Sequence, residues 1–331
     1  MKNIILLFSM LFATSALAND KVAYSEIDFI NPQTQQPLKL SIWYPEGKSC
    51  DDAKLCLSES TRLDQAILLS HGAMGSSREL NWIGYATASQ GFITVGVNHF
   101  GESWVYGKKS IQPYVGTKIW LRASELSAAI DLLQLNQSNT QAPLPIFNHS
   151  VNWQQLTAIG FSSGGSTAIT LGGGKYEPEL AIQYCASESS KGDLGCRYSE
   201  NLPEHIISIE EATQDYRDER IIKVIALDPA AGPMTTTKSL SNINIPVLIV
   251  GAKQNDFLPF DNHAGYYAST IPNASLYSLE DKAGHFVFID SCQHEHKAMG
   301  ISLCEDKEGV DRDNIHQQLY PKLFQFIYSG T

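Results

Sequence analysis

The chain reads LTAIGFSSGG over residues 156–165, and this stretch decides the predicted fold. Residues 157–161 form a short apolar run that is typical of a buried strand, and the residues after it can begin a helix. Gly160, Ser162 and Gly164 fit the pattern G-x-S-x-G at the junction. A serine on such a strained strand-to-helix turn exposes its hydroxyl, and glycine fits where a Cβ would collide with backbone. The stretch therefore predicts a nucleophile elbow centred on Ser162.

Outward from this elbow, apolar strands alternate with helices. Further strands are predicted over residues 22–29, 38–44, 65–70, 92–97, 221–227, 245–250 and 275–279. Helices are predicted over residues 78–90, 120–135 and 315–328, and from Ser163 onward. This alternation indicates an α/β protein with a mostly parallel sheet and helices on both faces. We expect one domain over residues 19–331.

A polar segment of residues 176–218, called the insert below, interrupts the alternation. It leaves from the helix after Ser162, and so it is expected near the mouth of a site there. Long connections in compact domains are often functional. The sequence leaves open whether the insert is a lid or a decorative insertion.

The first 18 residues have the layout of a secretory signal peptide. Lys2 precedes an apolar run over residues 4–12, and Ala16-Leu17-Ala18 offers a small-x-small cleavage site. The run is shorter than the roughly 20 residues that span a membrane. The residue directly after the cleavage site is Asn19 and not a cysteine, so a lipid anchor is not indicated. We expect a periplasmic or secreted protein.

Six cysteines follow this segment and fall into three sequence-local pairs. An even number of cysteines in an exported chain indicates disulfides. Local pairing predicts Cys50–Cys56, Cys185–Cys196 and Cys292–Cys304, although the sequence alone allows fifteen pairings. The sequence has no C-x-x-C motif, and His294 and His296 lack further ligands, so no metal is expected.

The formal net charge of −11 disfavours nucleic acid and anionic membrane surfaces as partners. A small-molecule substrate is the expected partner. The oligomeric state is left open.

Ser162 needs a base, because a serine hydroxyl is a weak nucleophile until a neighbour accepts its proton. His285 lies in the sequence DKAGHF, on a glycine-containing turn after the last predicted strand. The order serine, acid, histidine is the one expected for this architecture. His263 and His316 lie on predicted helices and are interpreted as surface residues, and His71 as a support of its loop.

Two aspartates follow strands that could bring a carboxylate to His285. Asp256 follows the strand over residues 245–250, and Asp228 ends the strand before it. We favour Asp256 as the acid, with Asp228 as the alternative. The acid would fix the imidazole tautomer and stabilise the imidazolium.

The oxyanion that forms on attack needs amide donors already in place. Ser163, the residue after the nucleophile, is expected to supply one N–H group. The loop over residues 71–75 is expected to supply the other, from Ala73 or, as second choice, Met74.

The motifs LSHG (69–72), GFSSG (160–164) and AGHF (283–286) resemble the α/β-hydrolase superfamily. More narrowly, SHG (70–72) with Ser76, Arg78 and ASQGF (88–92) resembles the branch of platelet-activating-factor acetylhydrolases and predicted dienelactone hydrolases. The tail, with CED (304–306), GVDR (309–312) and IH (315–316), is similar to exported bacterial members. The resemblance covers most of residues 22–328 and is weakest over the insert.

This resemblance implies an α/β-hydrolase fold and a serine hydrolase built on Ser162 and His285. Dienelactone hydrolases carry a cysteine nucleophile, so their activity is not carried over. In acetylhydrolases of this branch the acid occupies the place of Asp228, whereas other bacterial esterases place it like Asp256.

The sequence therefore predicts a serine esterase that acts on small or short-chain esters through an acyl-enzyme, without a cofactor. A lipid-directed acyl hydrolase and an acyltransferase are alternatives. A silent binding protein on the same scaffold is the alternative from another class, because one fold hosts many functions.

Overall fold

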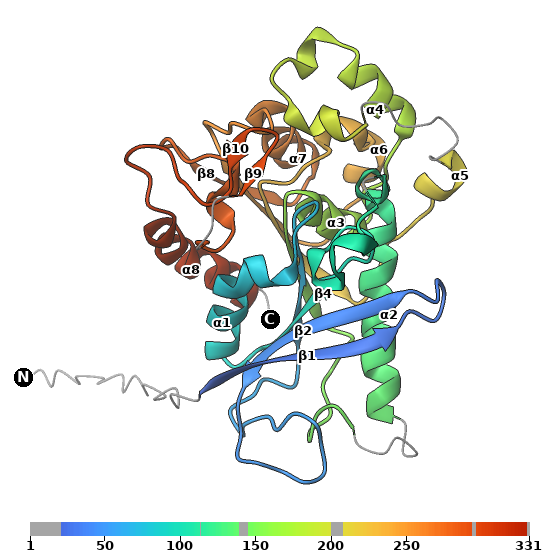
Figure 1. Cartoon of the computed structure of the whole chain (residues 1–331), viewed down its shortest axis with the longest axis vertical. Coiled ribbons are helices and arrows are strands. Elements are labelled where there is room, and N and C mark those ends of the chain that lie inside the picture. The colour runs from blue at the N-terminus through green and yellow to red at the C-terminus, as the bar shows by residue number, and fades with distance from the viewer. Residues whose placement is uncertain (1–20, 113, 139–144, 200–207, 293–295, 330–331) are drawn as a thin grey trace, which may run out of the picture.

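The computed structural model describes residues 21–112, 114–138, 145–199, 208–292 and 296–329, and an eight-stranded sheet runs through them (Figure 1). The strands are β1 (Val22–Ile30), β2 (Pro37–Pro45), β3 (Ala66–Ser70), β4 (Ile93–Asn98), β5 (Leu156–Phe161), β6 (Ile221–Leu227), β7 (Val247–Ala252) and β8 (Ala274–Leu279). Their spatial order is β1-β2-β4-β3-β5-β6-β7-β8. Strand β2 is antiparallel to both neighbours, and the strands from β4 to β8 are parallel.

The predicted mixed α/β architecture with a mostly parallel sheet is confirmed. All eight predicted strands are present, with ends displaced by no more than about two residues. A short hairpin of β9 (Lys297–Ala298) and β10 (Ile301–Ser302) lies outside this sheet.

Helices cover both faces of the sheet. They are α1 (Asn81–Ser89), α2 (Ile119–Ser138), α3 (Ser163–Leu171), α4 (Pro178–Cys185), α5 (Ile209–Ala212), α6 (Thr237–Leu240), α7 (Ala264–Thr270) and α8 (Arg312–Tyr328). Buried side chains of α2, α3 and α7 form one core, and those of α1 and α8 form the other. The two groups lie on opposite sides of the sheet in Figure 1. Helices α4, α5 and α6 were not predicted, because each has eight residues or fewer and lacks a sustained helical period.

The central strands show why one sheet supports two cores. Successive side chains of a strand point to opposite faces. In β5, Leu156 and Ala158 join the core with α2 and α3, whereas Ile159 and Phe161 join the core with α1 and α8. A strand buried on both faces is mostly apolar along its length, which is the pattern of this stretch of sequence.

The parallel order brings the carboxyl ends of β3, β5, β6, β7 and β8 to one edge of the sheet. Ligands of open α/β sheets bind outside this edge. The described part of the insert, with α4 and α5, lies at the same end of the molecule (Figure 1).

Three disulfides join the predicted partners, Cys50–Cys56, Cys185–Cys196 and Cys292–Cys304. Such bonds are compatible with an exported protein. The predicted signal peptide, residues 1–18, lies outside the described residues. Within the described ranges, no helix combines the length and apolar character needed to cross a bilayer.

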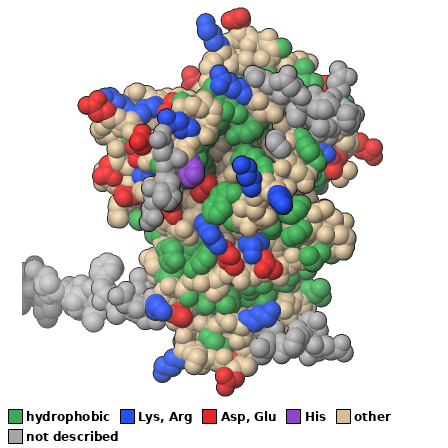
Figure 2. Space-filling view, viewed as in Figure 1, with side chains coloured by type: hydrophobic (Ala, Val, Ile, Leu, Met, Phe, Trp, Pro, Cys, Tyr) green, Lys and Arg blue, Asp and Glu red, His purple; other side chains and the backbone are tan. Residues whose placement is uncertain are grey.

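Charged side chains are dispersed over the face shown in Figure 2, where Lys and Arg alternate with Asp and Glu among apolar groups.

Candidate functional site

Ser162 occupies the turn between β5 and α3 in a strained backbone conformation. Its φ is 55° and its ψ is −120°, a combination that non-glycine residues rarely adopt. Such strain persists only where the surrounding structure enforces it, and it is concentrated at functional sites. The turn holds the Ser162 side chain at the carboxyl edge of the sheet, as the sequence predicted.

The strained turn is enforced by backbone packed against backbone. A Cβ on Gly164 would overlap the carbonyl oxygen of Ser70 at the end of β3. A Cβ on Gly160 would overlap the carbonyl oxygen of Gly164. The two glycines of the motif are therefore required by steric contact, because any side chain would push α3 away from the sheet.

A chain of two hydrogen bonds links Ser162, His285 and Asp228. Ser162 Oγ lies 2.9 Å from His285 Nε2, and His285 Nδ1 lies 2.7 Å from Asp228 Oδ2. A carboxylate accepts hydrogen bonds, so the imidazole proton sits on Nδ1 and the lone pair of Nε2 faces the serine. This tautomer is the one that can accept the proton of the Ser162 hydroxyl.

The prediction that Asp256 is the partner of the imidazole is wrong, and the alternative, Asp228, occupies that position. Asp256 instead accepts the main-chain N–H of His285 at 2.9 Å and forms an ion pair with Lys307 at 3.3 Å. Asp228 directly follows β6, which adjoins the strand of Ser162, so its carboxylate is close to the ring. Both aspartates thus hold His285, one through its ring and one through its backbone.

Asp228 is buried among donors that fix its orientation. Ala252 donates its main-chain N–H to Oδ1 at 3.2 Å, and the side-chain amide of Asn255 donates to Oδ2. Burial raises the pKa of Asp228, and the hydrogen bonds from His285 and Ala252 oppose that rise. The sequence did not indicate this role of Asn255. Its position next to Asp256 was the only signal that could have suggested it.

Aromatic rings enclose the imidazole. Phe257 stacks on His285 with ring centroids 5.1 Å apart, and Phe161 packs on it at 4.8 Å. The His285 side chain is only 1% exposed. Excluding water in this way strengthens the electrostatic interactions among the three polar groups.

The two predicted oxyanion donors flank Ser162. Ser163 is the first residue of α3, so its N–H has no partner one turn back in the helix. Ala73 lies in the loop after β3 and lines the space in front of Ser162. Among the described residues, no main-chain carbonyl accepts a hydrogen bond from the Ala73 N–H. The Ala73 and Ser163 amides therefore remain the candidates for the predicted oxyanion donors.

Buried polar groups support the loop that carries Ala73. Arg122 of α2 donates to the carbonyl oxygen of His71 at 2.6 Å and forms a buried ion pair with Glu102 at 3.6 Å. His71 Nε2 accepts the main-chain N–H of His99, so Nδ1 carries the proton and donates to the Gly72 carbonyl at 2.6 Å. Burial and the charge of Arg122 hold the pKa of His71 well below its usual range. His71 therefore supports its loop as a neutral ring, as predicted.

The interpretation of His263 and His316 as surface residues is wrong. His316 is buried, stacks on Trp82 with centroids 4.0 Å apart and bonds the Val287 carbonyl. His263 is also buried, and its Nε2 lies 2.7 Å from a carboxylate oxygen of Asp193 in the insert. The sequence pattern of a helix does not show whether its histidine is buried when a segment distant in the sequence covers that histidine.

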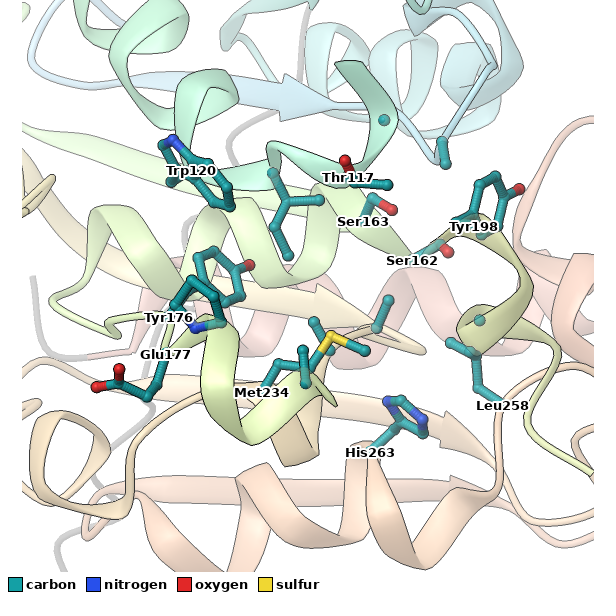
Figure 3. A pocket seen from close by; sticks show the side chains of 18 of the residues that line it. Thr117, Trp120, Ser162, Ser163, Tyr176, Glu177, Tyr198, Met234, Leu258 and His263 are labelled. Atoms are coloured by element: carbon teal, nitrogen blue, oxygen red, sulfur yellow. The ribbon is translucent and has the colours of Figure 1, made fainter. Parts of the chain in front are cut away.

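Two cavities adjoin Ser162. The small cavity has a volume of about 110 Å³ and lies between Trp120 and Tyr176 on one side and Tyr198 and Leu258 on the other (Figure 3). The large cavity has a volume of about 640 Å³. Its walls include Trp104, His285, Phe286, Ile289, Met299 and Leu303.

Groups of three or more His, Cys, Asp or Glu side chains that could hold a metal ion are absent from the described residues. No protein-family model matches the chain, and no curated protein sequence matches it either.

The packing of the elbow predicts a difference between two glycines. Gly164→Ala should lower the free energy of unfolding by about 3 kcal/mol or more, because the new methyl group overlaps the Ser70 backbone. Gly116→Ala is the matched control, since its Cβ would have no neighbour closer than 3.8 Å. Denaturant unfolding of both variants checks the prediction, and equal stabilities would contradict the packing argument.

Proposed function

We propose that this chain is a serine-dependent hydrolase of carboxylic esters that works through an acyl-enzyme on an α/β-hydrolase fold. The observation that carries the proposal is the hydrogen-bonded chain from Ser162 through His285 to Asp228, set on a strained turn. A binding protein has no need of that turn, which favours an enzyme over a silent scaffold. The three disulfides support the further proposal that the protein acts outside the cytoplasm.

In this mechanism His285 Nε2 accepts the proton of Ser162 as its Oγ attacks the ester carbonyl carbon. The negative charge that develops on the carbonyl oxygen is stabilised by the N–H groups of Ala73 and Ser163. His285 then donates its proton to the departing alkoxide, which leaves the acyl group on Ser162. A water molecule repeats the attack with His285 again as base, and Asp228 stabilises the imidazolium in both halves.

The small cavity supports a short acyl group. A cavity of about 150 Å³ holds the six carbons of benzene, so about 110 Å³ accommodates roughly four carbon atoms. A lipid-directed hydrolase of long acyl chains would need a longer cavity, and an acyltransferase would use an alcohol in place of water. The structure offers no specific observation in favour of either alternative.

The first test asks whether Ser162 is an activated nucleophile. A fluorophosphonate probe should label the wild-type protein, and Ser162→Ala should abolish both labelling and turnover of p-nitrophenyl acetate. Among p-nitrophenyl acetate, butyrate and palmitate, the two short esters should be preferred. Equal turnover by Ser162→Ala would refute the mechanism, and a preference for palmitate would refute the short-chain assignment.

The contacts of His285 predict unequal roles for the two aspartates. Asp228→Asn should lower kcat by on the order of 10⁴, because an amide at this position favours the wrong imidazole tautomer. Asp256→Asn should cost far less, because the amide oxygen can still accept the main-chain N–H of His285. Steady-state kinetics of the two folded variants measures both losses of kcat. A larger loss in Asp256→Asn than in Asp228→Asn would assign the role of catalytic acid to Asp256.

The activity should fall as the pH is lowered. The reaction needs an ionised Asp228 to stabilise the imidazolium, and acidification protonates this carboxylate. Because burial raises the pKa of Asp228, its protonation begins at a higher pH than that of an exposed aspartate. A profile of kcat/KM against pH measures the loss, with tryptophan fluorescence confirming that the protein stays folded. Activity that rises toward acid pH would contradict the assignment.

A further inference from the structure

The insert contributes a side chain to the wall between the two cavities. Its described part contains α4 and, after it, a short 3₁₀ helix, Leu194–Ser199, which carries Tyr198. Tyr198 lies near Ser162 and lines the small cavity (Figure 3). It also lines the large cavity.

Four of the described residues line both cavities: Ala73, Ser162, Tyr198 and Phe257. The chemistry proposed above already uses three of them, since Ser162 attacks, Ala73 donates to the oxyanion and Phe257 packs on the imidazole. Tyr198 has no part in that chemistry. Its position therefore makes it a partition between two compartments of one substrate site.

The partition is fixed by a buried contact between the insert and the body of the protein. His263 Nδ1 accepts the main-chain N–H of Gly232 at 3.3 Å, so the ring proton sits on Nε2 and is donated to Asp193 at 2.7 Å. Asp193 also accepts from the Tyr184 hydroxyl at 2.9 Å. Breaking such a contact leaves a buried carboxylate without its partner, which is costly.

Two further connections hold the same segment. The main-chain N–H of Leu194 donates to the carbonyl oxygen of Phe257 at 2.9 Å. The disulfide Cys185–Cys196 closes the loop that contains Asp193. Tyr198 follows this cross-linked loop by two residues, and so these connections limit the movement of the segment that carries it.

Proton transfer decides which part of an ester enters each compartment. His285 must donate its proton to the departing alkoxide, so the alcohol part lies on the His285 side. His285 lines the large cavity but not the small one. Ser163, an oxyanion donor, lines the small cavity. The acyl chain therefore enters the small cavity, and the alcohol part lies in the large one.

We propose that Tyr198 is a specificity-determining residue, which closes the acyl compartment and sets the longest acyl chain that the site accepts. The contact between Asp193 and His263 positions Tyr198 for this role. The inference rests on the ester hydrolysis proposed above. Burial raises the pKa of Tyr198 to about 12, so the side chain is a neutral phenol at working pH and acts through its bulk.

The test measures kcat/KM for p-nitrophenyl esters from acetate to octanoate, in which only the acyl chain changes. Tyr198→Ala joins the two cavities and should raise the ratio of kcat/KM for octanoate to kcat/KM for acetate by about 10-fold or more. The reason is that each methylene group bound in an apolar pocket raises kcat/KM by about 10-fold or more. Tyr198→Phe keeps the ring and should keep the wild-type ratio. Tyr85→Ala, at an exposed tyrosine of α1, is the matched control.

A second variant tests the partition without changing the tyrosine. Asp193→Asn weakens the contact with His263 and should shift the ratio in the same direction as Tyr198→Ala. The melting temperature of this variant is measured as a control. A value equal to that of the wild type indicates that the substitution affects the insert and not the stability of the whole chain. An unchanged ratio in both folded variants would overturn the proposal.

The direction of binding is tested with one variant in each cavity. Met234→Ala enlarges the small cavity and should favour longer acyl chains. Leu303→Ala enlarges the large cavity and should change the preference among acetate esters of different alcohols. Interchanged effects would reverse the assignment of the two compartments.

Absence of ester turnover and of fluorophosphonate labelling in the wild-type protein would instead refute the proposed function itself.

Discussion

The close approach of the α3 backbone to the end of β3 is the constraint on which the site depends. Gly164 lies against the Ser70 carbonyl, and this contact leaves Ser162 no room for an ordinary turn. The strained serine, the free N–H of Ser163 and the position of the loop after Ser70 all follow from it. Local strain of this kind is stable only because apolar cores on both faces hold β5 and its neighbours in register.

His285 shows how the rest of the sheet edge adapts to that fixed serine. Its turn has no strain of its own and is held from outside by two carboxylates. Asp256 fixes the main chain of the turn, and Asp228 fixes the ring. Because Asn255 bonds Asp228 and precedes Asp256, one short loop after β7 connects both supports. A shift of this loop would move the backbone and the ring of the histidine together.

The sequence predicted those features that depend on local pattern. The eight strands follow from short apolar runs, Ser162 from its glycines, and the disulfides from the spacing of the cysteines. The carboxylate that bonds the His285 ring could not be predicted in the same way, because Asp228 and Asp256 each follow a strand and the sequence does not show how their side chains are directed in space. The burial of His263 depends on Asp193, 70 residues earlier in the chain, and no periodicity of its own helix could reveal it.

The site therefore combines two kinds of structure with different tolerance to change. Ser162, Asp228 and His285 lie on turns that follow parallel strands, where backbone packing leaves little freedom. Tyr198, which lines both cavities, belongs to the insert. The insert is connected to the sheet edge through Asp193 and the Leu194 amide, and one disulfide closes its loop. Substitutions in the insert can reshape the cavities without moving the strands that carry Ser162 and Asp228. For the proposed hydrolase, the range of accepted acyl chains would change with the cross-linked loop, while the hydrogen-bonded chain of Ser162, His285 and Asp228 beneath it would stay intact.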